Sequence, residues 1–246
     1  MEGIKYGKLT LTPIQSGEAY SVTECERDAL DAVIPAQIDG IPVTEIGEYA
    51  FDGCASLRSV SFPEGEAAAL EEIGEYAFNG CVSLDSVRLP ECLYTIGRGA
   101  FYGCKSLKRA EFSESAYVAA YAFSHCESLT SVTKTKYASE GAFSFCSALD
   151  SLPLSEGAKM IDEDAFEHCV SLKDAVIPAS TVRIEALAFR SCTALRSVVF
   201  EETDGWFATN CYREGETALD LSDPKRNAEL LSRMDFDDGW LAWERK

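Results

Sequence analysis

The sequence predicts an α/β solenoid, a stack of short coils with parallel strands on one face and short helical turns on the other. Three observations predict this fold. One block recurs seven times, its copies follow at a nearly constant interval, and its apolar positions form two sets that suit a strand and a helical turn. Of the 246 residues, 46% are hydrophobic and 11% aromatic, which is enough for a sizeable core and argues against disorder.

The repeated block has the frame A-F-x-x-C-x-[SA]-L and begins with an Ala-Phe pair. Its phenylalanines are Phe51, Phe78, Phe101, Phe123, Phe143, Phe166 and Phe189. Successive copies are 27, 23, 22, 20, 23 and 23 residues apart. This interval is typical of leucine-rich repeats, whose period is roughly 20–29 residues, and it predicts about seven full coils.

The second half of each block predicts a strand. In the first copy, residues 58–62 alternate between polar and apolar, so that Val60 and Phe62 point inward while Ser59 and Ser61 point outward. Stacked coils would pair these strands into a parallel sheet. The outward side chains would then form one continuous face.

The other apolar set predicts the return arm of the coil. Ile46, Ala50, Phe51 and Cys54 follow at intervals of four, one and three residues, which suits one or two helical turns. The residues equivalent to Ile46 are Ile73, Ile96, Val118, Ala138, Ile161 and Ile184. Burial of each phenylalanine should contribute about 1.5–3 kcal/mol, and only stacking can bury both faces of a coil.

The two ends of a solenoid need caps, because they would otherwise expose apolar side chains and strand edges. We expect an N-terminal cap over residues 1–29, in which residues 6–23 form a β-hairpin around the Ser16-Gly17 turn. The repeats then extend over residues 30–203.

A C-terminal cap is expected over residues 204–246. Asp223 and Pro224 predict the start of a helix near 224–234, with Asp223 as its N-cap. Trp206, Trp240 and Trp243 follow the last full copy, and we expect them to cover the final coil.

The blocks IGEYAFDGCASL (46–57), IGEYAFNGCVSL (73–84) and IGRGAFYGCKSL (96–107) resemble the BspA-type leucine-rich repeats of bacteria. This resemblance covers about residues 30–200. It implies a protein-binding function, since family members are mostly surface or secreted proteins and some are adhesins, and it carries no catalytic residues. The chain departs from the family pattern in its middle, where the fifth coil is short and Lys134-Thr135-Lys136 ends the fourth strand. We expect a local change of curvature there.

The composition is acidic, with 41 acidic and 22 basic residues and a formal charge of −19. Lysine and arginine form no block, so nucleic acids and anionic membranes are not expected partners. We interpret the acidity as support for solubility, with a specific basic partner as the alternative. The apolar runs are too short to span a bilayer, and the N-terminus lacks the pattern of a signal peptide. This predicts a cytoplasmic protein, or a secreted one whose export signal lies outside this chain.

Cysteine and histidine are the residues most open to a chemical interpretation. Seven of the ten cysteines occupy one repeat position, three after the phenylalanine, which predicts a buried ladder of free thiols. Cys25, Cys92 and Cys211 lie outside the ladder and are candidates for surface reactivity. His125 and His168 occupy a position that is glycine in other copies, which disfavours catalysis. With no metal-ligand spacing or catalytic motif, we expect no cofactor, no metal and no enzymatic activity.

The outward strand face is therefore the candidate site for a protein partner. The candidate residues are Ser59, Ser61, Ser86, Arg88, Arg109, Glu111, Ser131, Thr133, Asp174 and Val176. Small outward residues could instead only permit regular stacking. We expect a monomeric, non-catalytic interaction module, and the alternative functions are a surface adhesin and a purely architectural protein.

Overall fold

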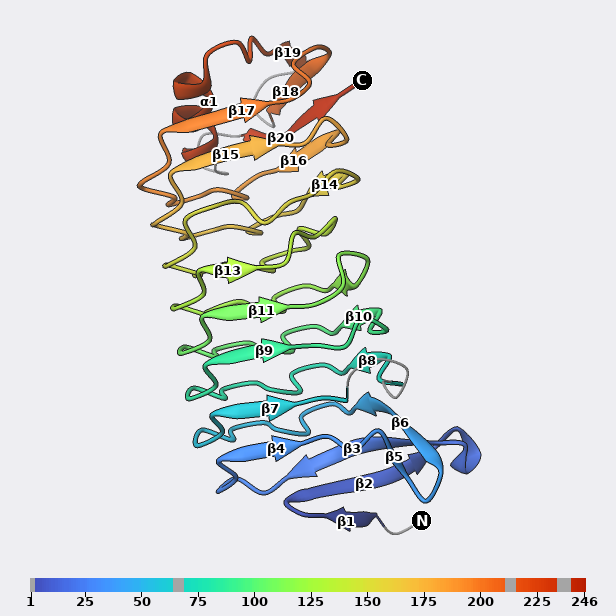
Figure 1. Ribbon diagram of the computed structural model, residues 1–246. Helices are drawn as coiled ribbons and strands as arrows, with labels where there is room; N and C mark the ends of the chain where they lie inside the picture. The colour runs from blue at the N-terminus through green and yellow to red at the C-terminus, as the bar shows by residue number, and fades with distance from the viewer. Residues whose placement is uncertain (1–2, 64–68, 211–215, 234–239) are drawn as a thin grey trace.

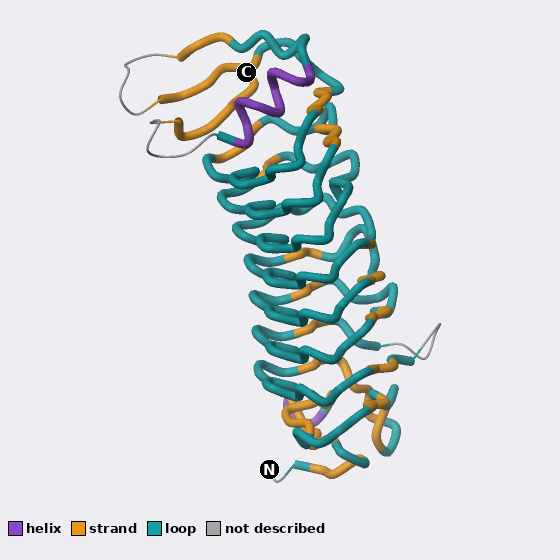
Figure 2. The backbone as a smooth tube through the Cα atoms, turned by 90° about the vertical axis from the view of Figure 1, so that its left-hand side faces the viewer, coloured by secondary structure: helices purple, strands orange, loops and turns teal. Residues whose placement is uncertain are grey.

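The computed structural model describes residues 3–63, 69–210, 216–233 and 240–246. It confirms the solenoid: coils follow one another from the N-terminal end of the molecule to the C-terminal end, as Figures 1 and 2 show. Each coil has three sides. Two carry short strands, and the third is a series of turns.

The first side carries the predicted parallel strands, and we call its outward surface the strand face (Figure 1). Its strands are β4 (Asp31–Val33), β7 (Ser59–Ser61), β9 (Ser86–Arg88), β11 (Arg109–Glu111), β13 (Ser131–Val132), β15 (Asp174–Ile177) and β17 (Ser197–Phe200). The alternation predicted from the sequence is present, since Val60 in β7 is buried between the exposed Ser59 and Ser61. In the fifth coil, Ser151 makes only an isolated bridge to Asp174.

The second side also consists of strands, where the sequence had suggested helical turns. Ile46, Ile73, Ile96 and Val118 lie in neighbouring strands of one sheet and pair in register. The strands of this side are β6 (Ile41–Ile46), β8 (Glu72–Ile73), β10 (Thr95–Ile96), β12 (Tyr117–Val118), β14 (Met160–Ile161) and β16 (Arg183–Glu185). Between β12 and β14, Ala138 bridges to Ile161. In addition, β5 (Gln37–Ile38) pairs with β6.

The third side contains turns, so the expected helical turns are not confirmed. The amide N–H groups of Tyr49, Phe51 and Gly53 donate to carbonyls of the next coil, at 2.7–3.0 Å, and not to carbonyls four residues back. Tyr49 and Gly53 have φ angles of 57° and 66°, which an α-helix does not contain. The +1 and +3 spacing that suggested a helix is shared by such consecutive turns.

The core is organised as a column of seven parallel phenylalanine rings along the solenoid. Each ring stacks on that of the next coil, with centroids 4.5–5.7 Å apart and interplanar angles of 1–19°. All seven side chains are at most 1% exposed. The repeat therefore stabilises the stack directly, because every phenylalanine needs the neighbouring coil for burial.

The cysteine ladder lies beside this column and is confirmed as a set of free thiols. In each coil from the second copy onward, the cysteine Sγ donates to the carbonyl of the preceding coil's phenylalanine, at 3.1–3.3 Å. Burial raises the pKa of Cys146 and Cys192 to about 12. Cys25 was expected to be a candidate for surface reactivity, but its side chain is buried, only 5% exposed. Cys211 lies outside the described residues.

We predict that the ladder thiols are unreactive in the native protein, because all seven side chains are fully buried and inaccessible to reagents. Of the nine described cysteines, only Cys92 is partly exposed. In a titration with Ellman's reagent, Cys92 should react far faster than the ladder thiols, which should become accessible after denaturation without reductant. Two or more disulfides found in the denatured, unreduced protein would contradict the ladder.

The N-terminal end of the solenoid is covered by antiparallel strands. These are β1 (Ile4–Tyr6), β2 (Leu9–Ile14) and β3 (Ala19–Cys25), with a short 3-10 turn, Gln15–Gly17, between β2 and β3. β3 pairs in parallel with β6 and thereby joins the hairpin to the first coil. Leu9, Leu11 and Val22 are buried against that coil.

The C-terminal end is covered by a sheet and a helix. Strands β18 (Trp206–Asn210), β19 (Glu216–Ala218) and β20 (Trp240–Arg245) extend the second side, with β20 antiparallel to β16. Helix α1 (Pro224–Ser232) packs against β17. The Asp223 carboxylate caps it by accepting from the backbone N–H groups of Lys225 and Arg226. Trp206 and Trp243 are buried beside Phe200.

Candidate functional site

The structure places the predicted partner-binding residues together on the strand face. Exposed side chains there are Ser59, Ser61, Arg88, Arg109, Glu111, Ser131, Asp174 and Val176. Ser86 and Thr133 are half-buried. The pairing register aligns equivalent residues of neighbouring coils, for example Arg109 with Ser86 and Ser131. The face is thus an ordered array of side chains.

Three predicted residues, Arg88, Glu111 and Asp174, form ion pairs within the molecule. Arg88 Nε lies 3.3 Å from Glu111 Oε2, and Asp174 Oδ2 lies 3.1 Å from Arg196 Nη2. Such exposed pairs typically contribute only about 0–1 kcal/mol, so they are available for rearrangement on binding. Sequence reasoning missed Arg196, because it sits one residue before the outward column and reaches across to the preceding coil.

Arg109 stands out because its neighbours in register are serines. Within the described part of the chain, its guanidinium forms no ion pair within 4 Å. The pKa of the Asp85 carboxyl is lowered mainly by a hydrogen bond from Lys108 and by the charge of Lys108. The charge of Arg109 makes a smaller contribution in the same direction. Arg109 is therefore an exposed cation near the centre of the face, and its direct hydrogen-bonding capacity is unused by the described residues.

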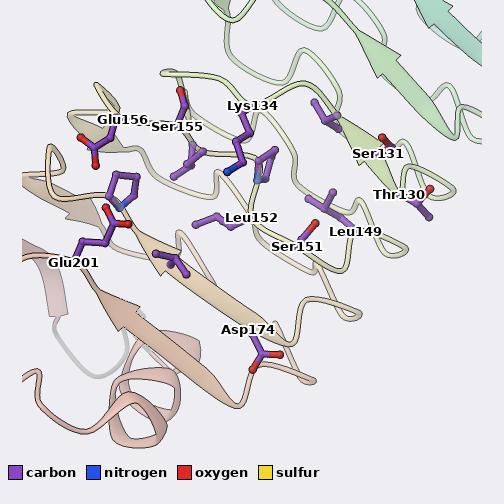
Figure 3. Close-up of a pocket in the computed structure, with 15 residues that line it drawn as sticks. Thr130, Ser131, Lys134, Leu149, Ser151, Leu152, Ser155, Glu156, Asp174 and Glu201 are labelled. Carbon is purple, nitrogen blue, oxygen red and sulfur yellow. The ribbon is translucent and has the colours of Figure 1, made fainter.

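The strand face contains a hollow of about 500 Å³ where the sheet is interrupted. β13 is the edge of the three-stranded sheet β13-β11-β9, and the fifth coil contributes no full strand beside it. Figure 3 shows side chains from the fourth to the seventh coils around this hollow. Its lining includes the predicted Ser131, Asp174 and Val176, and also Lys134, Leu152, Glu156 and Glu201, which sequence reasoning did not select.

The departures noted in the sequence coincide with this interruption. Pro153, which the alternation places outward, is buried, and Leu152 is only half-buried. The Thr133 hydroxyl, and not a backbone carbonyl, accepts from the N–H of Phe112 at 3.1 Å. The 20-residue interval and the sequence Lys134-Thr135-Lys136 thus mark the place where the strand face is interrupted.

The two histidines form part of a ring column on the turn side. His125 and His168 stack on the two faces of Phe145, with centroids 4.4 and 4.5 Å away. All three have φ angles of 57–59°, where earlier coils have Gly53, Gly80 and Gly103. The pKa of His125 is lowered, mainly because the imidazole is partly buried. The stacking gives both imidazoles a packing role.

Asp164, also on the turn side, is held in an unfavourable environment. Burial, followed by the charges of Glu167 and Glu163, raises the pKa of its carboxyl to about 6. Its Oδ1 atom is buried without a hydrogen-bond partner in the described structure, and its φ angle is 57°. The ionised carboxylate therefore destabilises the fold above the carboxyl's ordinary pKa, and protonation between about pH 6 and pH 4 relieves this cost.

We predict that Asp164→Asn stabilises the protein at neutral pH, since asparagine is uncharged and tolerates this backbone conformation. The apparent melting temperature at pH 7.5 should rise by about 1–3 °C, and the gain should shrink as the pH falls from 6 to 4. Thermal unfolding followed by circular dichroism checks this. Glu75→Gln, at an exposed position, is the control. A gain that persists unchanged at pH 4 would show that the carboxyl's charge is not the cause.

Within the described ranges, no group of three or more histidine, cysteine, aspartate or glutamate side chains could hold a metal ion. No helix among those residues has the length and apolar character needed to cross a membrane.

Stacked coils with a parallel strand face and a buried phenylalanine column define a leucine-rich-repeat protein. The chain belongs to the BspA-type leucine-rich-repeat family, whose model matches residues 36–138 and 117–214. Proteins of this repeat class are generally protein-interaction modules and are typically non-catalytic. A search of curated proteins gives no significant match.

Two solved structures support the assignment. A leucine-rich-repeat protein of T. pallidum is 28% identical with a TM-score of 0.66, and the match covers 79% of this chain and 91% of that one. A leucine-rich-repeat protein of Bacteroides ovatus is 25% identical with a TM-score of 0.55, over 76% of this chain and 56% of that one.

Proposed function

We propose that this protein is a non-catalytic interaction module that binds a protein partner along the strand face. The observation that carries this proposal is the position of Arg109. It projects from between two serines, Ser86 and Ser131, and the described residues provide no ion pair for it. An exposed arginine above small hydroxyl side chains can donate to a carboxylate or a carbonyl of a partner without displacing an internal bond.

The apolar part of the face lies toward the C-terminus and supports the same function. Val176 and Val199 are paired in register and are 50% and 42% exposed. Exposed aliphatic side chains beside charged ones are typical of the mixed surfaces through which proteins associate. The caps at both ends support a monomer, because they cover the apolar side chains that two copies would otherwise stack together.

The test is partner capture with variants that change the face and keep the fold. The immobilised protein would be incubated with lysate and culture medium of the source organism, and captured proteins would be quantified by mass spectrometry. Arg109→Glu and Val176→Glu should each reduce capture of the specific partner at least tenfold. Asp174 is a poorer choice, since its reversal would also break its ion pair with Arg196.

Lys159→Glu is the matched control, because Lys159 is an exposed cation beside β14, on the second side. It should leave capture unchanged. A partner retained equally by all three variants would place the binding site elsewhere and overturn the proposal.

A further inference from the structure

The hollow in the strand face combines aliphatic walls with an acidic end. Leu152, Val176 and Pro178 contribute apolar surface to it, and Val176 is half exposed. Its volume, about 500 Å³, is within the range of about 300–1,000 Å³ found for small-ligand sites. One long side chain could enter it with room to adjust.

The acidic end is formed by Glu156 and Glu201, which come from loops two coils apart. Oε1 of Glu156 and Oε2 of Glu201 both accept from the backbone N–H of Ala179, each at 3.1 Å. The two oxygens therefore lie within about 6 Å of each other. Figure 3 shows both carboxylates at the same end of the hollow. Both side chains are exposed and share one protein N–H group, so most of their hydrogen-bonding capacity faces solvent and is open to donors of a ligand.

Basic residues of the described chain do not neutralise the Glu156 and Glu201 carboxylates by direct ion pairs. Among the residues that the structure describes, no lysine, arginine or histidine nitrogen lies within 4 Å of either carboxylate. The nearby Arg245 donates to the carbonyl of Ala179, at 2.7 Å. Lys134 lines the hollow but forms no ion pair there with the described carboxylates. The buried Ser155 hydroxyl, also in the lining, has no hydrogen-bond partner in the described structure.

We propose that this hollow receives an arginine side chain of the protein partner, an inference that rests on the proposed function. The aliphatic stem of an arginine can pack along Leu152 and Val176 while its head remains charged. The planar guanidinium carries five N–H donors and can face two carboxylates at once. Arg109 and this hollow would then give the face two charged contacts of opposite sign, which fixes the orientation of the partner.

Other side chains fit the hollow less well. An apolar side chain would cover Glu156 and Glu201 and leave their charges without compensation. A glutamate would be repelled by both. Lysine carries a compact ammonium with three donors and lacks the planar fork, so it should bind more weakly than arginine.

The experiment measures binding of a small probe, so it needs no identified partner. The probes are Nα-acetyl-arginine N-methylamide, the matching lysine compound, and the citrulline compound, which has nearly the shape of arginine but no charge. Methyl-labelled protein would be titrated with each and followed by NMR. The arginine probe should shift the methyl signals of Leu152 and Val176 saturably and bind at least fivefold more tightly than the citrulline probe.

Two variants should move this preference in opposite directions. Glu156→Gln with Glu201→Gln should reduce arginine affinity to that of citrulline, because the compensating charges are gone. Lys134→Met should raise the affinity for the arginine probe twofold or more, because a repelling cation is removed. Glu71→Gln with Glu72→Gln, beside and within β8 on the second side, should have no effect, and the methyl spectra would report that each variant is folded.

The proposal would be overturned by equal affinity for arginine and citrulline, by shifts remote from Leu152 and Val176, or by no saturable shift at all. These outcomes would leave the strand face as a binding surface intact. Conversely, arginine binding in the hollow together with partner capture insensitive to Arg109→Glu and Val176→Glu would overturn the proposed function alone.

Discussion

Phe123→Ala should lower the free energy of unfolding by about 3–5 kcal/mol. The ring is fully buried in the middle of the phenylalanine column, 5.3 Å from Phe101 and 5.7 Å from Phe143. The neighbouring coils cannot collapse into the space, because backbone hydrogen bonds between coils fix their separation. Among these is the bond from the N–H of Phe123 to the carbonyl of Ala142, at 2.9 Å. Urea denaturation followed by circular dichroism measures the loss.

We also predict which coils the substitution loosens. Coils of a solenoid contact only their neighbours, so hydrogen exchange should accelerate most in the fourth coil and the two beside it. Tyr94→Ala is the control, since Tyr94 is 59% exposed, and the change should alter stability by about 0.5 kcal/mol or less. A loss below about 1 kcal/mol for Phe123→Ala would mean that the column does not support the fold as described.

Trp243→Ala should destabilise the protein by a similar amount, about 3–5 kcal/mol, but at one end of the molecule. The side chain is 3% exposed, lies opposite Ile184 in the register of β20 with β16, and stacks on Phe200 at 6.0 Å. Its removal uncovers the last coil. Hydrogen exchange should therefore increase over residues 184–200 while residues 73–123 keep their protection.

The matched control is Phe207→Ala on β18, a half-buried aromatic residue of the same sheet. It should cost about 1 kcal/mol. If Trp243→Ala loosened all coils equally, the cap would not be a local cover, and the solenoid would unfold as one cooperative unit.

The buried frame of the solenoid could be predicted from the sequence, because it repeats. The positions of Phe51, Cys54 and Val60 recur in every coil, and each copy repeats the same packing requirement. The second side was harder to predict, since Ile46 and its equivalents recur with an interval that suits both a helical turn and a strand followed by turns. What decides between them is the left-handed backbone at Tyr49, which no apolar pattern encodes.

The candidate site could be predicted only in part. Arg109 and Val176 follow from the alternation, which predicts outward side chains wherever the strand is regular. Glu156 and Glu201 lie beyond the strands, and they come together at the N–H of Ala179, from which both accept. Such a meeting depends on how loops of separate coils are placed. The repeat frame does not contain that information, although the irregular fifth coil marked its neighbourhood.

The hydrogen bonds from each turn to the next have a consequence for how such a protein can change in evolution. The N–H donors of one coil meet carbonyls at equivalent positions of its neighbour, and each thiol meets an equivalent phenylalanine carbonyl. Excision of residues 79–101 would join Phe78 to Tyr102 and recreate the same Ala-Phe block. The number of coils can therefore grow or shrink by whole repeats with the interior unchanged, while the spacing between Arg109 and the hollow changes only if the exchange falls between them.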